Sequence, residues 1–104
     1  MPTFVCSLSW TDQGIKFPEG IPLRRNLART EVAAALGVTV KQILYTSGDS
    51  DILMILEAAD AEAVTKWALV VSSRGNVRTR TARAFTEQEF DTLLNAVLPY
   101  TGHT

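Results

Sequence analysis

The chain has 104 residues, of which 46% are hydrophobic and 20% are charged, and its formal net charge is −1. This length suits one domain with a modest core, and the composition is typical of a soluble globular protein. The nearly balanced charge favours neither a nucleic-acid partner nor an anionic membrane surface, and no apolar run approaches the ~20 residues of a membrane-spanning helix.

The first predicted element is a strand over about residues 3–10. Apolar side chains occupy every second position there: Phe4, Cys6, Leu8 and Trp10. This two-residue period is that of a strand with one buried face. Cys6 is the only cysteine, so no internal disulfide is possible, and we expect a buried, unreactive thiol rather than a reactive one, in a cytoplasmic protein. The first residues lack a charged segment and a long apolar core, so we expect no secretory signal.

A turn and a helix are predicted next. Residues 11–14 have turn chemistry, and two prolines and a glycine make residues 15–22 an irregular connection. A helix is expected over about residues 23–36, with Gly37 as its C-terminal cap. Its predicted inward stripe is Ala28, Val32, Ala35 and Leu36. Arg24, Arg25 and Arg29 suggest either an anion site or, as we expect, a solvated helix face.

Two strands joined by a polar hairpin follow. The first covers about residues 38–47, with Val38, Val40, Gln42 and Leu44 on one face and Ile43 and Tyr45 on the other. The second, about residues 51–58, is apolar at every position from Ile52 to Leu56. A strand with one face in water alternates apolar and polar side chains. We therefore expect both faces of this strand to be covered, one by the chain's helices and one by a second copy.

The remaining elements are a helix, a strand and a last helix. Asp60 is a predicted N-cap for residues 60–73, whose inward side chains are Ala61, Val64, Ala68 and Val71. Trp67 and Leu69 broaden this apolar surface. The strand covers residues 76–84, with Arg78 and Arg80 on one face.

The last helix is predicted from a capping box formed by Thr86 and Glu89, and it ends at about Leu98. Its predicted inward residues are Phe90, Leu93, Leu94 and Val97. Residues 99–104 form a tail with the only histidine, His103, so the chain lacks the histidines for a catalytic triad or a multi-histidine metal site.

This order of elements, βαββαβ plus a C-terminal helix, predicts an α+β, ferredoxin-like fold with a four-stranded antiparallel sheet. We expect a single domain over residues 1–98. Right-handed crossovers place the first and third strands in the centre of the sheet. Both crossover helices then cover one face, and the apolar face left open predicts a homodimer with its two sheets face to face.

Three stretches resemble the GYD domain family: Trp10–Lys16, Gly48–Asp51 and Gly75–Thr86. They occur in the family's order, and the likeness reaches to about Leu98. The resemblance implies a ferredoxin-like subunit of the dimeric α/β-barrel type, and it implies no established activity. The chain departs from the family at its tyrosine, because Ser50 stands in that position.

Candidate ligand-binding residues lie at strand ends and on the fourth strand. We expect a small-molecule pocket that uses Trp10, Asp12, Tyr45, Asp51, Arg78 and Arg80. Paired arginines bind carboxylate or phosphate groups, although salt bridges across the sheet or the dimer are the alternative. A loop-fixing network with Trp10 in the core is the alternative for the first strand end, and packing is the alternative for Tyr45.

Three functions fit these residues. The first is a module that binds or senses a small anionic metabolite. The second is an enzyme without a cofactor (an oxygenase, isomerase or decarboxylase of a small acid), with Asp49 or Asp51 as its base, although both also suit a tight turn. The third is a structural assembly subunit. Ser50 has no histidine to activate it as a nucleophile, and we expect no metal, cofactor, nucleic-acid or membrane partner.

Overall fold

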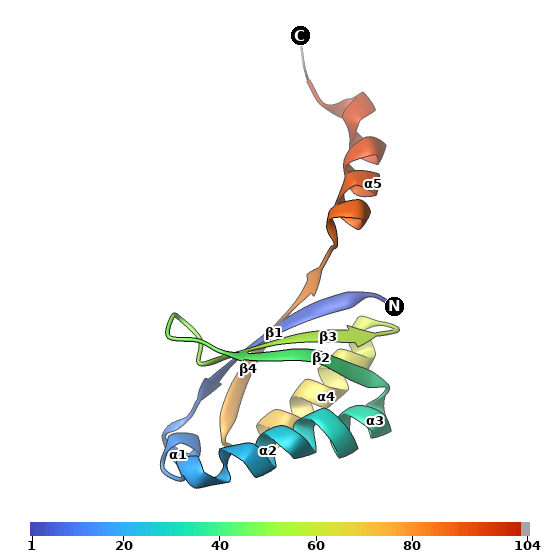
Figure 1. Ribbon diagram of the computed structural model, residues 1–104. Helices are drawn as coiled ribbons and strands as arrows, with labels where there is room; N and C mark the ends of the chain where they lie inside the picture. The colour runs from blue at the N-terminus through green and yellow to red at the C-terminus, as the bar shows by residue number, and fades with distance from the viewer. Residues whose placement is uncertain (103–104) are drawn as a thin grey trace.

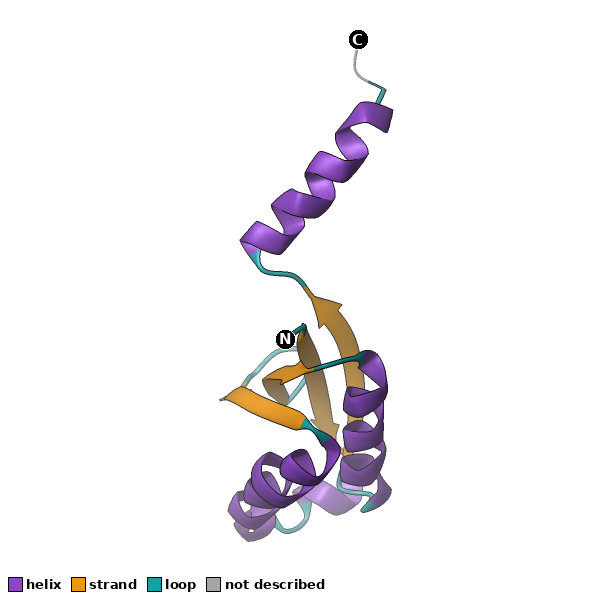
Figure 2. Ribbon diagram, turned by 90° about the vertical axis from the view of Figure 1, so that its right-hand side faces the viewer, coloured by secondary structure: helices purple, strands orange, loops and turns teal. Residues whose placement is uncertain are grey.

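The computed structural model describes residues 1–102, which form a four-stranded antiparallel sheet, helices on one of its faces, and a last helix that projects away (Figures 1 and 2). The strands are β1 (Thr3–Trp10), β2 (Val38–Tyr45), β3 (Ile52–Ala58) and β4 (Val77–Ala84). Their order in the sheet is β2-β3-β1-β4, so β1 and β3 are central, as predicted. The chain therefore has the predicted ferredoxin-like α+β fold. His103, in the predicted tail, lies outside the described residues.

Short helical segments precede the first crossover. Helix α1 (Asp12–Ile15) follows Thr11, whose hydroxyl accepts a hydrogen bond from the Gly14 amide. A 3-10 turn (Pro18–Gly20) and helix α2 (Ile21–Leu27) come next. The predicted turn and irregular connection are thus partly helical, because Thr11 acts as an N-cap and each proline sits in a first turn, where its missing amide costs nothing.

The core lies between the sheet and its helices. Every second residue of β1 and β3 is buried, and these side chains meet helix α4 (Ala61–Ser73) and the helical segment over residues 21–36. Trp67 is fully buried, and its indole nitrogen donates a hydrogen bond to the Ala28 carbonyl 2.9 Å away. Trp67, which we expected only to broaden the apolar surface of this helix, is therefore a central core residue. The predicted inward residue Ala61 is exposed.

A π-helical turn (Ala28–Val32) separates α2 from α3 (Ala33–Leu36). Such a turn adds one residue to the helical repeat, so the side chains after it rotate relative to a regular helix. Ala33 is consequently buried and Ala35 is exposed, and our prediction of an inward Ala35 was wrong. Gly37 closes the segment with a φ of 73°, a left-handed conformation that glycine adopts at little cost.

A β-bulge interrupts β2. The register of β2 against β3 shifts between Val40 and Gln42. A bulge adds one residue to a strand and reverses the faces beyond it. Tyr45 therefore lies on the helix-covered side together with Val38 and Val40, and Leu44 turns to the open side. The predicted sharing of one face by Val38 and Leu44 was wrong.

Helix α5 (Glu87–Val97) starts with the predicted capping box but does not return to the domain. The molecule is 58 Å long because α5 continues beyond the end of β4 (Figure 1). Its apolar side chains Phe90, Leu93, Leu94 and Val97 are between 40% and 56% exposed. Our prediction that they pack inward on their own subunit was wrong. No helix in the described part of the chain is long and apolar enough to cross a bilayer.

Candidate functional site

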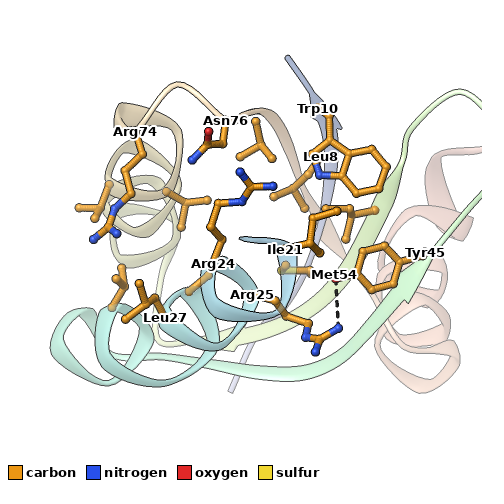
Figure 3. A pocket seen from close by; sticks show the side chains of 16 residues that line it. Leu8, Trp10, Ile21, Arg24, Arg25, Leu27, Tyr45, Met54, Arg74 and Asn76 are labelled. Atoms are coloured by element: carbon orange, nitrogen blue, oxygen red, sulfur yellow. Dashed lines mark hydrogen bonds between the residues drawn. The ribbon is translucent and has the colours of Figure 1, made fainter. Parts of the chain in front are cut away.

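A pocket opens between the sheet and helices α2 and α4, beside the end of β1 (Figure 3). It encloses about 60 Å³. Its floor is apolar and includes Leu8, Ala28, Val32, Ile52, Met54, Val71 and Val77. The C-terminal ends of β1 and β2 and the start of β4 meet here, so the pocket draws on segments from most of the chain.

Two aromatic rings form one wall of the pocket. Trp10 and Tyr45 stack with their ring centroids 6.2 Å apart and an angle of 21° between the ring planes. Alternation along β1 brings Trp10 to this side, and the β2 bulge brings Tyr45 to the same side. Tyr45 lines the pocket and is 44% exposed, so this wall of the pocket is open to solvent. Such a pair offers a flat apolar surface with a hydroxyl group at its rim.

Three arginines surround the pocket: Arg24 and Arg25 from α2, and Arg74 from the end of α4. The guanidinium of Arg24 donates to the Gly14 carbonyl at 2.9 Å, and that of Arg25 donates to the Tyr45 hydroxyl at 3.4 Å. None of the described residues that line the pocket is acidic. The site therefore carries an excess of positive charge over an apolar floor, which suits an anion with an apolar part.

A hydrogen-bond network holds the end of the sheet around this pocket. The Thr11 amide donates to the Asn76 carbonyl at 3.0 Å, and the Thr11 hydroxyl donates to the Gly75 carbonyl. The Gln13 side chain donates to the Arg74 carbonyl and the Asn76 side chain at 3.0 and 3.1 Å. These contacts fix the turn that carries Arg74 and Asn76. Such a loop-fixing network was one of the two possibilities that the sequence left open.

Asp51 ties the hairpin to the central strand. Its carboxylate accepts a hydrogen bond from the Trp10 amide at 2.9 Å, and its own amide donates to the Leu8 carbonyl at 2.9 Å. Asp49 is exposed, and neither carboxylate lines the pocket. The Asp51 carboxylate thus bonds a backbone amide, as we expected for an aspartate in a tight turn. Neither aspartate is positioned to act as a base in this pocket.

The predicted site residues do not all come together. Trp10 and Tyr45 line the pocket, and Asp51 supports it through a backbone contact. Asp12 is exposed in the first turn of α1. Arg78 and Arg80 pair in register with Ser9 and Ser7, whose side chains point away from the helices. The two arginines therefore lie on the opposite face of the sheet and cannot reach this pocket.

Sequence reasoning assigned Arg24 and Arg25 mainly to a solvated helix face and did not connect Arg74 with them. The only signal was the arginine pair just before an apolar helical stripe. The arginine pair is part of a pocket because the crossover places α2 beside the end of β1 (Figure 1). Contacts between segments that lie far apart in the chain carry no local sequence pattern.

Cys6 lies in the core on the pocket side of β1. Burial raises the pKa of its thiol, and the Thr81 hydroxyl donates a hydrogen bond to its sulfur at 3.6 Å. A thiol in this environment is a poor nucleophile. Among residues 1–102, no group of three or more histidine, cysteine, aspartate and glutamate side chains is arranged to hold a metal ion.

The sheet order, together with the helices on one face, defines a ferredoxin-like α+β protein. Residues 4–94 match the GYD domain, and the chain belongs to this family, as its three stretches indicated. A relative from Thermus thermophilus, the glutamine synthetase and cystathionine beta-lyase binding protein, is 33% identical over 84 residues, which are 81% of this chain and 88% of the relative.

Solved structures with the same fold include two regulatory proteins from Mycobacterium tuberculosis. The leucine response regulatory protein superposes with a TM-score of 0.59 at 20% identity over 82% of this chain. The feast or famine regulatory protein in complex with L-methionine gives 0.61 at 16% identity over 83% of this chain. This chain spans 51% of the length of each. At these identities the likeness shows the fold alone.

Proposed function

We propose that the protein is a ligand-binding or sensor-like module that takes a small organic anion with an apolar group into the pocket beside β1. The observation that carries this proposal is the placement of three arginines, Arg24, Arg25 and Arg74, around an apolar cavity whose lining contains no acidic residue among those described. Charged hydrogen bonds in a partly dry site are stronger than those in water.

The size of the cavity narrows the ligand class. Its volume of about 60 Å³ is several times what one water molecule needs. It accommodates a short aliphatic group or the edge of a ring, and the anionic group of the same molecule stays at the mouth. Arg25 suits such a group because, within residues 1–102, its guanidinium makes only one hydrogen bond, to the Tyr45 hydroxyl at 3.4 Å. Small carboxylates with apolar tails, including amino acids, fit this description.

Titration calorimetry with matched ligands tests the proposal. The panel contains short aliphatic and aromatic carboxylates, the corresponding primary amides, and apolar amino acids. We expect carboxylates to bind and the uncharged amides to bind at least ~10-fold more weakly, because a hydrogen bond between charged groups contributes ~1.5–3 kcal/mol.

Two arginine variants on the same helical segment provide the control. Arg25→Met is expected to weaken carboxylate binding by ~10-fold or more. Arg29→Met removes the same charge from an exposed side chain that bonds Asn26 and does not line the pocket. Equal losses in both variants would show that the pocket is not the site, and so would equal affinities for carboxylates and amides.

We also propose that two copies pair through the open faces of their sheets. This face carries the apolar side chains Val5, Leu44, Leu53 and Ile55, which no helix of the described chain covers. A patch of this kind on an isolated subunit favours association. Light scattering at micromolar concentration is expected to give twice the mass of the chain, and a monomer would contradict the pairing.

A second candidate function is a module that binds metabolic enzymes. The name of the Thermus thermophilus relative, the glutamine synthetase and cystathionine beta-lyase binding protein, favours this candidate. Surface plasmon resonance with these two enzymes from the same source as this chain tests it. Saturable binding would support an adaptor, and its absence at micromolar concentrations would leave the pocket as the only proposed site.

A further inference from the structure

Helix α5 is held away from its own sheet by the segment that precedes it. Only two residues separate the end of β4 at Ala84 from the start of α5 at Glu87. Arg83 fixes this connection: its guanidinium lies 4.4 Å from the centroid of the Phe85 ring and 3.5 Å from the Glu89 carboxylate. The capping box then aligns the first turn of the helix. The direction in which α5 leaves the sheet is thus set locally (Figure 2).

The apolar stripe of α5 needs a covering surface. Phe90, Leu93, Leu94 and Val97 recur with helical spacing on one side of the helix, and each is at least 40% exposed. Glu87 and Asp91 flank this stripe, and no basic residue lies in the last turn of the helix. The helix is therefore an apolar strip with an acidic border.

The β4 edge of the open sheet face has the complementary charge. The centre of this face is apolar, with Val5, Leu53 and Ile55, and faces the other sheet in the proposed pairing, whereas its β4 edge carries Arg78 and Arg80. Within residues 1–102, the side chains of these two arginines make no hydrogen bond or ion pair, and neither do Glu87 and Asp91. An acidic apolar helix and a basic apolar face are thus both without partners in one chain.

We propose that two copies of this chain exchange their α5 helices, so that the apolar stripe of each α5 packs against the other copy along the β4 edge of the paired sheets and its acidic border meets Arg78 and Arg80 there. The inference rests on the proposed pairing through the sheet faces. The two-fold axis of such a pair lies between the two sheets and runs perpendicular to the strands. The β4 strands of the two copies then lie opposite each other and run in opposite directions, so the end of one β4 is beside the start of the other. The first turn of α5 then lies near the arginines of the second copy, and the two contacts are equivalent.

Charge reversal on each surface tests the exchange. The sheet variant is Arg78→Glu/Arg80→Glu, and the helix variant is Glu87→Lys/Asp91→Lys; all four side chains are exposed. Each variant alone is expected to raise the dissociation constant of its homodimer by at least 10-fold in sedimentation equilibrium. An equimolar mixture is expected to restore wild-type affinity as a heterodimer, identified by its mass in native mass spectrometry, because both of its contacts pair opposite charges.

A matched control and a third variant separate the outcomes. Glu31→Lys/Glu62→Lys makes the same charge change as the helix variant at exposed positions away from both surfaces, and its dissociation constant is expected to match that of the wild type. Failure of the mixture to recover dimers overturns the exchange. If Phe90→Ser/Leu94→Ser dimerises as tightly as the wild type, the exchange is wrong while the sheet pairing stands. If the wild type is a monomer, both are wrong, and the calorimetric test of the pocket is unaffected.

Discussion

Among the glycines in the described part of the chain, Gly14 has the least room for a side chain. A Cβ atom added to Gly14 would lie 2.0 Å from the Asn76 carbonyl oxygen and 2.8 Å from its carbon. Both atoms belong to the backbone, so no side-chain rotation relieves the clash. The Asn76 carbonyl also accepts the Thr11 amide hydrogen bond at 3.0 Å, and a shift large enough to admit a methyl group weakens that bond.

The magnitude for Gly14→Ala follows from these contacts. Overpacking by one methyl group costs ~1–3 kcal/mol, and loss of the Thr11 hydrogen bond adds ~1 kcal/mol. Because Gly14 lies in a helical segment, alanine recovers up to ~1 kcal/mol of helix propensity. We therefore expect the free energy of unfolding to fall by ~1–3 kcal/mol, which lowers Tm by roughly 5–20 °C in a domain of this size.

Urea unfolding followed by tryptophan fluorescence measures this change, and Gly48→Ala is the control. A Cβ atom at Gly48 meets nothing within 4 Å, so its variant is expected to stay within ~0.5 kcal/mol of the wild type. Gly14→Ala is also expected to weaken carboxylate binding, because the displaced turn carries Arg74 and Asn76. Equal stabilities of the two variants would refute the close approach of α1 to this turn.

Three further outcomes follow from single contacts. The thiol of Cys6, whose pKa is raised by burial, is expected to resist Ellman's reagent at neutral pH in the folded chain and to react fully in guanidinium chloride; labelling at equal rates would contradict its burial. The hydrogen bond from the Thr86 amide, together with the charge of Arg83, lowers the pKa of Glu89. The Glu89 carboxylate therefore stabilises the helix cap at pH values above its pKa in the unfolded chain, and this stabilisation is lost as the pH falls through its pKa in the folded chain. The protection factor of the Thr86 amide, which is its intrinsic exchange rate divided by the measured rate, is expected to fall over that acidic range in the wild type and to stay constant in Glu89→Gln. Trp67→Phe leaves the buried Ala28 carbonyl without its donor and is expected to cost at least ~1–3 kcal/mol in urea unfolding, and a loss below ~0.5 kcal/mol would contradict the role of this bond.

The strands and their order were predictable because their signals are local. Alternation along β1, the apolar run of β3 and the caps at Asp60 and Thr86 each depend on neighbouring residues. Once the order of elements was known, right-handed crossovers left few topologies. The sheet order therefore followed from patterns that a single sequence contains.

Two of the errors share one physical cause. The π turn at Ala28–Val32 and the bulge after Val40 each add a residue to a regular repeat. Beyond the insertion, a periodic assignment puts side chains on the wrong face, which is why Ala35 and Leu44 were misplaced. No residue type marks either insertion, because it is the packing of the segment on both sides that decides where the extra residue is accommodated.

The sequence predicted one apolar stripe on α5, but this stripe is exposed and does not pack on its own subunit. Helical spacing shows that Phe90, Leu93, Leu94 and Val97 form one surface, and it cannot tell which chain covers that surface. The connection through Arg83 and the capping box directs the helix outward. The sequence pattern thus identifies the apolar surface of the helix, whereas the geometry at the helix entry sets the direction in which that surface points.

The hairpin that lacks the family tyrosine shows how the recognised stretches act together. Asp51 holds the Trp10 amide, and Thr46 bonds the Asp51 and Ser50 carbonyls, so the turn is maintained by a carboxylate and by the backbone. None of these bonds requires a phenol at position 50. The first and third stretches meet in the network of Thr11 and Gln13 with the turn at Gly75. All three therefore close the same end of the sheet, where Trp10 and Arg74 border the pocket, and their shared role is to hold that end in shape.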